Sequence, residues 1–165
     1  MKKCFLSLLF LASFASAAAL ASDEAFPPDK NIDLLKLDGT SLKLTDQFKG
    51  QYIVLDFSAP WCSYCVELGH SHDSNPDIQS MFNGEKCSFA TLVLKRELQE
   101  WVNIFTAGGF MAVNSFGVGA TLKTIAGKFG FTLEYIPSLL VIDREGKLVA
   151  SKVGEMPSEV EQLCR

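Results

Sequence analysis

The sequence lacks the features of several common protein classes. It has no run of basic residues and no arginine-rich segment, and its formal net charge is -4, so we expect no nucleic-acid partner. It has no internal repeat and no low-complexity segment. Only one close pair of cysteines is present, which argues against a zinc ribbon because such a site needs a second close pair of ligands. What remains is a chain of 165 residues that is 48% hydrophobic, as is typical of one folded domain with its own core.

Long apolar runs are also scarce, and none outside the N-terminus is long enough to cross a membrane. Residues 1–21 begin with a basic start, continue as an apolar stretch and end in small residues. This pattern predicts a secretory signal peptide that is cleaved after Ala21. An uncleaved anchor is the alternative, but the apolar stretch is shorter than the roughly 20 residues of a membrane-spanning helix. We therefore expect a periplasmic or secreted protein with a flexible lead-in over 22–31 and one domain over 32–165.

The residues that carry chemistry are Cys62-Ser63-Tyr64-Cys65, which follow the apolar run 52–57 after a short break. This order predicts a buried strand that delivers a Cys-x-x-Cys to the first turn of a helix, the arrangement of a redox motif. There the first thiol gains the positive end of the helix and its unpaired N–H groups, which lower the pKa of the thiol. We expect Cys62 to be the exposed nucleophile, and Cys65, one turn later and more buried, to resolve the mixed disulfide.

The rest of the chain alternates predicted strands and helices. Strands are predicted at 32–37, 41–44, 52–57, 87–94, 138–142 and 147–153. Helices or helical turns are predicted at 45–50, 62–71, 78–82, 96–105, 121–129 and 157–164. The glycine- and phenylalanine-rich segment 106–120 is expected to be irregular, either as a mobile flap or as a hydrophobic insertion that packs. This order predicts an α/β sandwich with a mixed central sheet.

The stretch Phe57-Ser58-Ala59-Pro60-Trp61-Cys62-Ser63-Tyr64-Cys65 resembles the thioredoxin signature, in which a strand and a tryptophan lead into Cys-x-x-Cys. The preceding residues 37–55 resemble the entry of the periplasmic TlpA/ResA-like branch. Residues 135–147 are similar to the second hallmark of that family, a cis-proline followed by a strand, an acidic turn, a glycine and a last strand. The resemblance covers 32–164. It implies a thioredoxin-like three-layer sandwich with an N-terminal hairpin extension and a helical insertion.

The resemblance also implies roles for residues near the cysteines. Asp56 stands where thioredoxins carry a buried acid, which would have a raised pKa and could accept the proton of Cys65. The alternative is a strand-end aspartate that points to solvent. Pro137 corresponds to the cis-proline, and the backbone of Ile136 would hydrogen-bond an extended substrate. Trp61 would form part of the docking surface.

Between the cysteines, Ser63 and Tyr64 replace the Gly-Pro that is usual in thioredoxins. The resemblance therefore implies that these two residues tune the redox potential, and it leaves the direction of electron flow open. The protein could reduce, oxidise or shuffle disulfides.

Cys4 lies in the predicted leader, and two further cysteines and both histidines stand apart from this motif. Cys87 and Cys164 either bond to each other, which would tie the C-terminus to the core, or remain two free buried thiols. His70 and His72 follow the motif on the same helix, and we interpret them as solvent-facing side chains rather than metal ligands. We therefore expect no metal, and no cofactor beyond a redox-active Cys62–Cys65 disulfide.

Together these observations predict a thiol–disulfide oxidoreductase, and in particular a reductant of periplasmic protein disulfides. Its expected partners are protein disulfide or dithiol substrates and a membrane redox protein, and we expect a monomer. Two alternatives remain. One is a disulfide oxidase or isomerase, and the other is a thioredoxin-fold module that delivers a metal or binds a partner.

Overall fold

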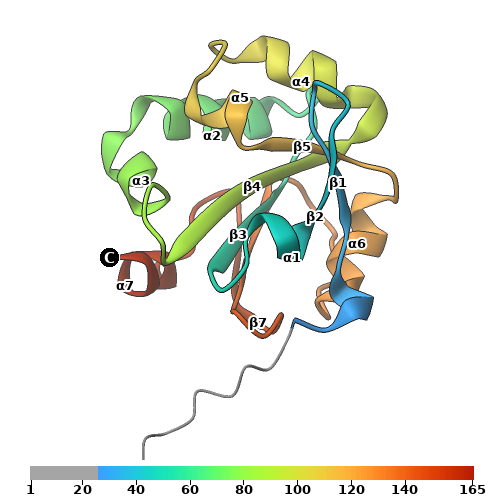
Figure 1. The fold of residues 1–165 in the computed structure, drawn as a ribbon. Coiled ribbons are helices and arrows are strands. Elements are labelled where there is room, and N and C mark those ends of the chain that lie inside the picture. The colour runs from blue at the N-terminus through green and yellow to red at the C-terminus, as the bar shows by residue number, and fades with distance from the viewer. Residues whose placement is uncertain (1–25) are drawn as a thin grey trace, which may run out of the picture.

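A computed structural model describes residues 26–165 of the chain, so the predicted signal peptide lies outside the described residues. The described residues form a seven-stranded sheet with the strand order β2-β1-β5-β4-β3-β6-β7 (Figure 1). The strands are β1 (Asp33–Leu35), β2 (Ser41–Lys43), β3 (Tyr52–Phe57), β4 (Cys87–Leu94), β5 (Ser115–Val118), β6 (Ser138–Ile142) and β7 (Leu148–Val153).

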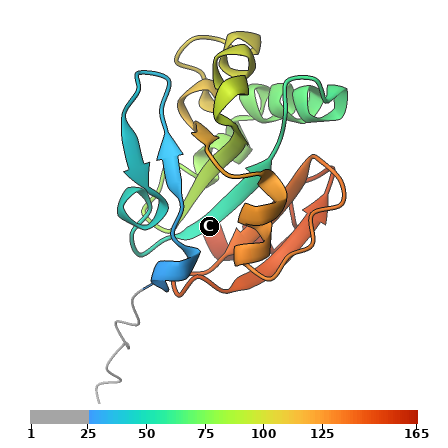
Figure 2. The same ribbon diagram turned by 90° about the vertical axis from the view of Figure 1, so that its right-hand side faces the viewer.

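The sheet is mixed, as predicted. The central strands β3, β4 and β5 are parallel, and β6 runs antiparallel to β3. Antiparallel pairs close both ends of the sheet, β1 with β2 at one end and β6 with β7 at the other (Figure 2). The predicted N-terminal hairpin is therefore confirmed. The bounds of β3, β4 and β6 agree with the predicted apolar runs, because strands that are buried on both faces consist of nearly continuous hydrophobic residues.

Helices cover both faces of the sheet. They are η1 (Pro28–Lys30), α1 (Leu44–Gln47), α2 (Ser63–Ser74), α3 (Pro76–Met81), η2 (Lys95–Glu97), α4 (Leu98–Ile104), α5 (Phe110–Val113), α6 (Leu122–Lys128) and α7 (Glu159–Cys164). Residues of α1 and α6 share one hydrophobic core with Ile53, Leu55 and Phe57 of β3. Residues of α2, α4, α5 and α7 share the other core with Val54 of the same strand. Alternation along β3 thus separates two cores, and the predicted three-layer sandwich is confirmed.

The segment 106–120 is more regular than predicted, because it holds α5 and the strand β5. All four residues of β5 are buried, and the strand lies between β1 and β4. Gly117 allows η2 to lie against the strand, since a Cβ atom there would stand 3.0 Å from the Cα atom of Lys95. The Trp101 indole donates a hydrogen bond of 2.8 Å to the Ser115 hydroxyl. The segment is therefore a packed insertion rather than a mobile flap.

The described part of the predicted lead-in, residues 26–31, also belongs to the packed domain. The ring of Phe26 lies edge-on to Phe129, with ring centroids 6.4 Å apart. The Lys30 ammonium donates a hydrogen bond of 2.9 Å to the carbonyl oxygen of Gly146. These contacts correct the expectation of a flexible lead-in up to residue 31. Within residues 26–165, no helix is both long and apolar enough to span a bilayer.

Candidate active site

The Cys-x-x-Cys lies where β3 leaves the sheet and α2 begins. The strand ends at Phe57, and the amide of Cys62 donates to the carbonyl oxygen of Ala59 at 3.1 Å, which turns the chain into the helix. Cys62 is the N-cap of α2, and its sulfur accepts a hydrogen bond of 3.2 Å from the amide of Cys65. The predicted position of the motif between a strand and a helix start is therefore confirmed. The sulfur of Cys62 accepts a hydrogen bond from an amide of the first turn that would otherwise be unpaired.

Cys62 and Cys65 are joined by a disulfide, with their Cα atoms 5.2 Å apart. Their exposure differs as predicted. Cys62 is half-buried, whereas Cys65 is 1% exposed. An attacking thiol can therefore approach only Cys62. When this sulfur is released as a leaving group, the positive end of a twelve-residue helix favours its thiolate form.

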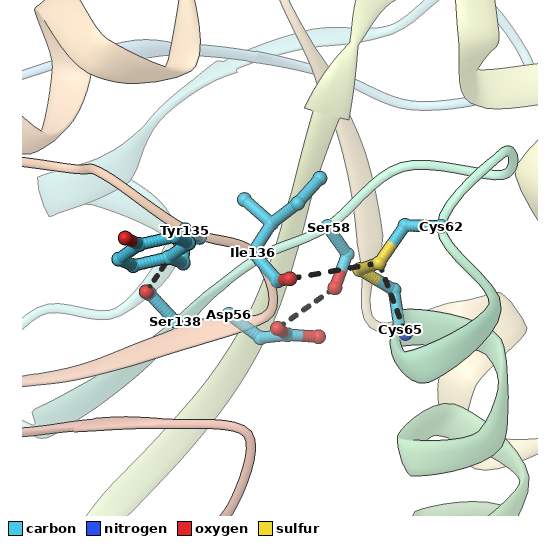
Figure 3. The surroundings of a disulfide bond; sticks show 7 residues. All are labelled: Asp56, Ser58, Cys62, Cys65, Tyr135, Ile136 and Ser138. Atoms are coloured by element: carbon cyan, nitrogen blue, oxygen red, sulfur yellow. Dashed lines mark hydrogen bonds between the residues drawn. A yellow bond between two sulfur atoms is a disulfide. The ribbon is translucent and has the colours of Figure 1, made fainter.

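A loop distant in sequence lies against this sulfur. The Ile136–Pro137 peptide bond is cis, as the resemblance implied. The Cys62 sulfur lies 3.7 Å from the carbonyl oxygen of Ile136 (Figure 3). Pro137 is buried, and its own carbonyl accepts a hydrogen bond of 3.0 Å from the amide of Gly154 in the segment after β7. The fold thus brings together two motifs that are 74 residues apart.

Exposed aromatic side chains lie in or next to both motifs. Trp61 is 70% exposed and Tyr64 is 74% exposed, one on each side of Cys62 in sequence. Tyr135, which sequence reasoning did not single out, is 67% exposed and directly precedes Ile136. Its position beside the cis-proline was the signal that could have found it. Ser63 and Tyr64 occupy the exposed first turn of α2, and their tuning of the redox potential stays a prediction.

Asp56 is buried at 1% exposure, so the solvent-facing alternative is wrong. Alternation puts its side chain on the same face of β3 as Val54, the face covered by α2. Its two carboxylate oxygens accept hydrogen bonds from two buried hydroxyls, Ser58 at 2.8 Å and Thr91 at 3.2 Å. Burial raises the pKa of Asp56 to about 7, although both hydroxyls oppose this shift. The carboxyl can therefore hold or release a proton near neutral pH.

Sequence reasoning missed Ser58 and Thr91. Each was visible only as a small polar residue in an apolar surrounding, Ser58 after the strand 52–57 and Thr91 inside the run 87–94. A hydroxyl in such a place needs a hydrogen-bond partner. The sequence does not say which one, because the pairing of Asp56 with Thr91 across β3 and β4 depends on the register of the sheet.

The other two cysteines of residues 26–165 form a second disulfide. Cys87 and Cys164 are bonded, with Cα atoms 5.4 Å apart and a sequence separation of 77. Cys87 is fully buried, and Cys164 is 8% exposed. The bond joins the start of β4 to the end of α7 and so ties the C-terminus to the core.

The expectation of two solvent-facing histidines is wrong for one of them. His70 is exposed, but His72 is only 1% exposed because α2 turns it inward against Phe89, with ring centroids 5.4 Å apart. Its Nδ1 atom has no hydrogen-bond partner, and burial lowers the pKa of the imidazole to about 4. Residues 26–165 contain no group of three or more His, Cys, Asp or Glu side chains that could hold a metal ion.

Comparison with known families agrees with this geometry. The family model of the thioredoxin-like domain matches residues 45–164, well over half of the chain. The chain therefore belongs to the thioredoxin-like family. Among curated proteins, none matches the sequence.

Solved structures share the fold. The pneumococcal exposed lipoprotein thioredoxin of Streptococcus pneumoniae is 23% identical with a TM-score of 0.59, and the match covers 80% of this chain and 95% of that one. The thioredoxin domain of a thiol-disulfide oxidoreductase from Bacteroides vulgatus is 21% identical with a TM-score of 0.58, covering 89% and 100%. A thiol:disulfide interchange protein from Bacteroides sp. is 20% identical with a TM-score of 0.55, covering 78% and 79%. These similarities establish the architecture.

Proposed function

We propose that this member of the thioredoxin-like family is a thiol–disulfide oxidoreductase that exchanges disulfides with protein substrates through Cys62 and Cys65. The position of the Cys62 sulfur carries the proposal. It is accessible at the N-cap of α2, and it faces the carbonyl oxygen that precedes a cis-proline at 3.7 Å. An incoming thiolate can reach a sulfur in this position, whereas Cys65 is shielded.

In the proposed direction the reduced protein donates electrons. The Cys62 thiolate attacks one sulfur of a substrate disulfide, that bond breaks, and one substrate thiolate leaves. Cys65 then loses its proton and attacks the Cys62 sulfur. The mixed disulfide breaks, the Cys62–Cys65 bond forms, and the second substrate thiolate leaves. Two electrons have passed to the substrate, whose sulfurs take up two protons. Asp56 is the proposed acceptor of the Cys65 proton, because a pKa of about 7 suits transfer near neutral pH.

The proposed docking surface surrounds the Cys62 sulfur. The backbone of Ile136 lies next to it, and extended peptides commonly add to exposed backbone of this kind. Trp61, which directly precedes Cys62, offers a large apolar side chain at 70% exposure. Aromatic side chains with this exposure are typical of contact surfaces.

We further propose that the leader, residues 1–21, exports the protein to the periplasm, where it acts as a monomer and is reduced again by a membrane protein. The buried Cys87–Cys164 bond supports this location, since structural disulfides form and persist in oxidising compartments. Reductants need a supply of electrons there, because the periplasm itself is kept oxidising.

Insulin reduction tests the proposal. With dithiothreitol as electron source, the protein should accelerate the reduction of insulin, and Cys62→Ser should return the rate to the uncatalysed background. The double variant Cys87→Ser/Cys164→Ser is the matched control, because it removes the other disulfide and should stay active. Equal rates for the protein and Cys62→Ser would refute the proposed activity.

The reduction potential of the Cys62–Cys65 pair tests the direction. A reduction potential of about -270 mV supports a reductant, and a reduction potential of about -120 mV supports the oxidase alternative. A potential below about -300 mV without insulin activity would indicate a structural bond. Stoichiometric copper or zinc bound through these cysteines would instead favour a metal-delivery module.

A further inference from the structure

The hydroxyls that hold Asp56 occupy different places relative to the cysteines. Thr91 lies beside Asp56 on the neighbouring strand, since the two residues are register partners of β3 and β4. Ser58 lies two residues after Asp56 in the direction of Cys62. Successive residues along a strand rise about 3.3 Å and alternate in face. Ser58 is therefore further toward the disulfide on the same face.

Ser58 is held firmly in this place. Its amide donates a hydrogen bond of 3.1 Å to the carbonyl oxygen of Leu92, which continues the pairing of β3 with β4 by one step. Its side chain is fully buried, and its hydroxyl donates to Oδ1 of Asp56 at 2.8 Å. Figure 3 shows Ser58 on the side of the Asp56 carboxyl that faces Cys62 and Cys65. Thr91 binds the other carboxylate oxygen, Oδ2, at 3.2 Å.

The side-chain hydrogen bonds to the Asp56 carboxyl come from two neutral hydroxyls. Burial and the two hydroxyls account for the shift of its pKa. Its register partner on β6 is the apolar Leu139. In the first turn of α2, the buried titratable group is Cys65, whereas Tyr64 is exposed. The orientation of the carboxyl therefore depends on two neutral donors, and only one of them lies toward the sulfurs.

We propose that Ser58 is a positioning residue for disulfide exchange, whose hydroxyl orients Oδ1 of Asp56 toward the cysteines so that this oxygen receives the Cys65 proton. The inference rests on the proposed function. In the step concerned, the proton passes from Cys65 to Asp56 while the Cys65 sulfur bonds to Cys62. The mixed disulfide breaks at the same time, and its electron pair leaves with the substrate sulfur. Ser58 gains and loses no proton in this step.

Stopped-flow reaction of the reduced protein with the aromatic disulfide DTNB separates the two thiols. Attack by Cys62 releases the first coloured thiolate at a rate that depends on DTNB concentration. Attack by Cys65 on the mixed disulfide releases the second at a rate that does not. Ser58→Ala should leave the first phase unchanged within about twofold and slow the second by about tenfold, part of the 10²–10⁴-fold that a positioned proton acceptor supplies. Ser58→Thr, which keeps the hydroxyl, should restore the second phase.

Thr91→Val is the matched control, since it also removes one hydroxyl from the carboxyl. Both Ser58→Ala and Thr91→Val remove a hydrogen bond that lowers the pKa of Asp56, so both should shift the pH midpoint of the second phase upward. Only Ser58→Ala should also lower the rate on the plateau above that midpoint. Equal plateau rates in the two variants would overturn the proposal.

A double-mutant cycle tests whether Ser58 acts through Asp56. In an Asp56→Asn background, Ser58→Ala should slow the second phase no further. A full additional loss in that background would also overturn the proposal. Failure of the proposed function would look different, because the unsubstituted protein would then release no second thiolate at all. Circular dichroism and thermal melting of each variant establish that the fold is intact.

Discussion

The two disulfides in residues 26–165 contain the same bond in opposite surroundings. Cys62–Cys65 closes a loop with a sequence separation of 3, at a helix N-terminus, with one sulfur accessible. Cys87–Cys164 spans a separation of 77 and lies in the core, with exposures of 0% and 8%. In the first disulfide, the Cys62 sulfur accepts a hydrogen bond from a backbone amide, and the strand before it carries the buried carboxyl of Asp56. If Cys62–Cys65 is the redox-active bond that we propose, exposure and local charge, rather than the bond itself, distinguish the two disulfides.

The largest expected difference between the two bonds is in their rate of reduction. Thiol reductants should reach Cys62–Cys65 directly, but they should reach Cys87–Cys164 only when the domain opens. Opening costs several kcal/mol, so we expect the second bond to be reduced on the order of 10³-fold more slowly. Alkylation with iodoacetamide during reduction by dithiothreitol, followed by mass spectrometry of the cysteine peptides, measures both rates. Similar reduction rates for the two bonds in the native protein would contradict this expectation.

The second difference is in stability. Removing the long-range bond by Cys87→Ser/Cys164→Ser should lower the free energy of unfolding by about 4 kcal/mol, because the cross-link restricts a long loop of the unfolded chain. Removing the short one by Cys62→Ser/Cys65→Ser should cost about 2 kcal/mol. Urea unfolding of the oxidised protein and both double variants measures the two values. A larger loss for the Cys62/Cys65 pair would contradict this ranking.

Asp56, in the strand that leads to Cys62, should make the folded protein less stable as the pH rises. Its pKa is about 7 in the folded protein against an ordinary 3.8, so the folded state keeps a proton that the unfolded state loses. Stability is therefore complete below pH 3.8 and falls as the pH rises to about 7, by about 4 kcal/mol in all. Asp56→Asn should remove this pH dependence of stability, and at pH 8 it should unfold at higher urea concentration than the unsubstituted protein. In the reaction with DTNB, the same variant should release the second thiolate more slowly.

His72 should act in the opposite direction at the other end of α2, where it packs on Phe89, two residues from Cys87. Its pKa is about 4 in the folded protein against an ordinary 6.5, so its contribution is complete above pH 6.5 and falls as the pH drops toward 4. The loss approaches about 3 kcal/mol. Urea midpoints from pH 4 to 7 should become less pH-dependent in His72→Leu. His70→Leu, at the exposed histidine of the same helix, is the matched control and should keep the dependence of the unsubstituted protein.

Much of the fold was predictable because it depends on local patterns. The bounds of β3, β4 and β6 follow from apolar runs, and the hairpin of β1 and β2 follows from its turn residues. β5 was not predictable in this way. Ser115-Phe116-Gly117-Val118 reads as a weak strand, since glycine disfavours strands. Its glycine is required only because η2 lies against it.

The candidate site divides along the same line. The Cys-x-x-Cys, Asp56 and Pro137 were found from the sequence, since each belongs to a motif of contiguous residues. Ser58 and Thr91 as partners of Asp56, and the burial of His72, were not found, because each depends on the register of strands or on the face that a helix turns inward.

The sequence alone was enough to place the Cys-x-x-Cys at a strand-to-helix turn, because the strand, the turn and the helix start are encoded within ten residues around Cys62. Only the tertiary structure decided which of the two disulfides is accessible. Burial is a property of packed surfaces, to which residues distant along the chain contribute. The same packing places the carbonyl of Ile136 beside the sulfur of Cys62. It also allows two hydroxyls to donate hydrogen bonds to Asp56. A Cys-x-x-Cys motif is thus encoded by neighbouring residues, but its surroundings depend on residues that are distant in the sequence.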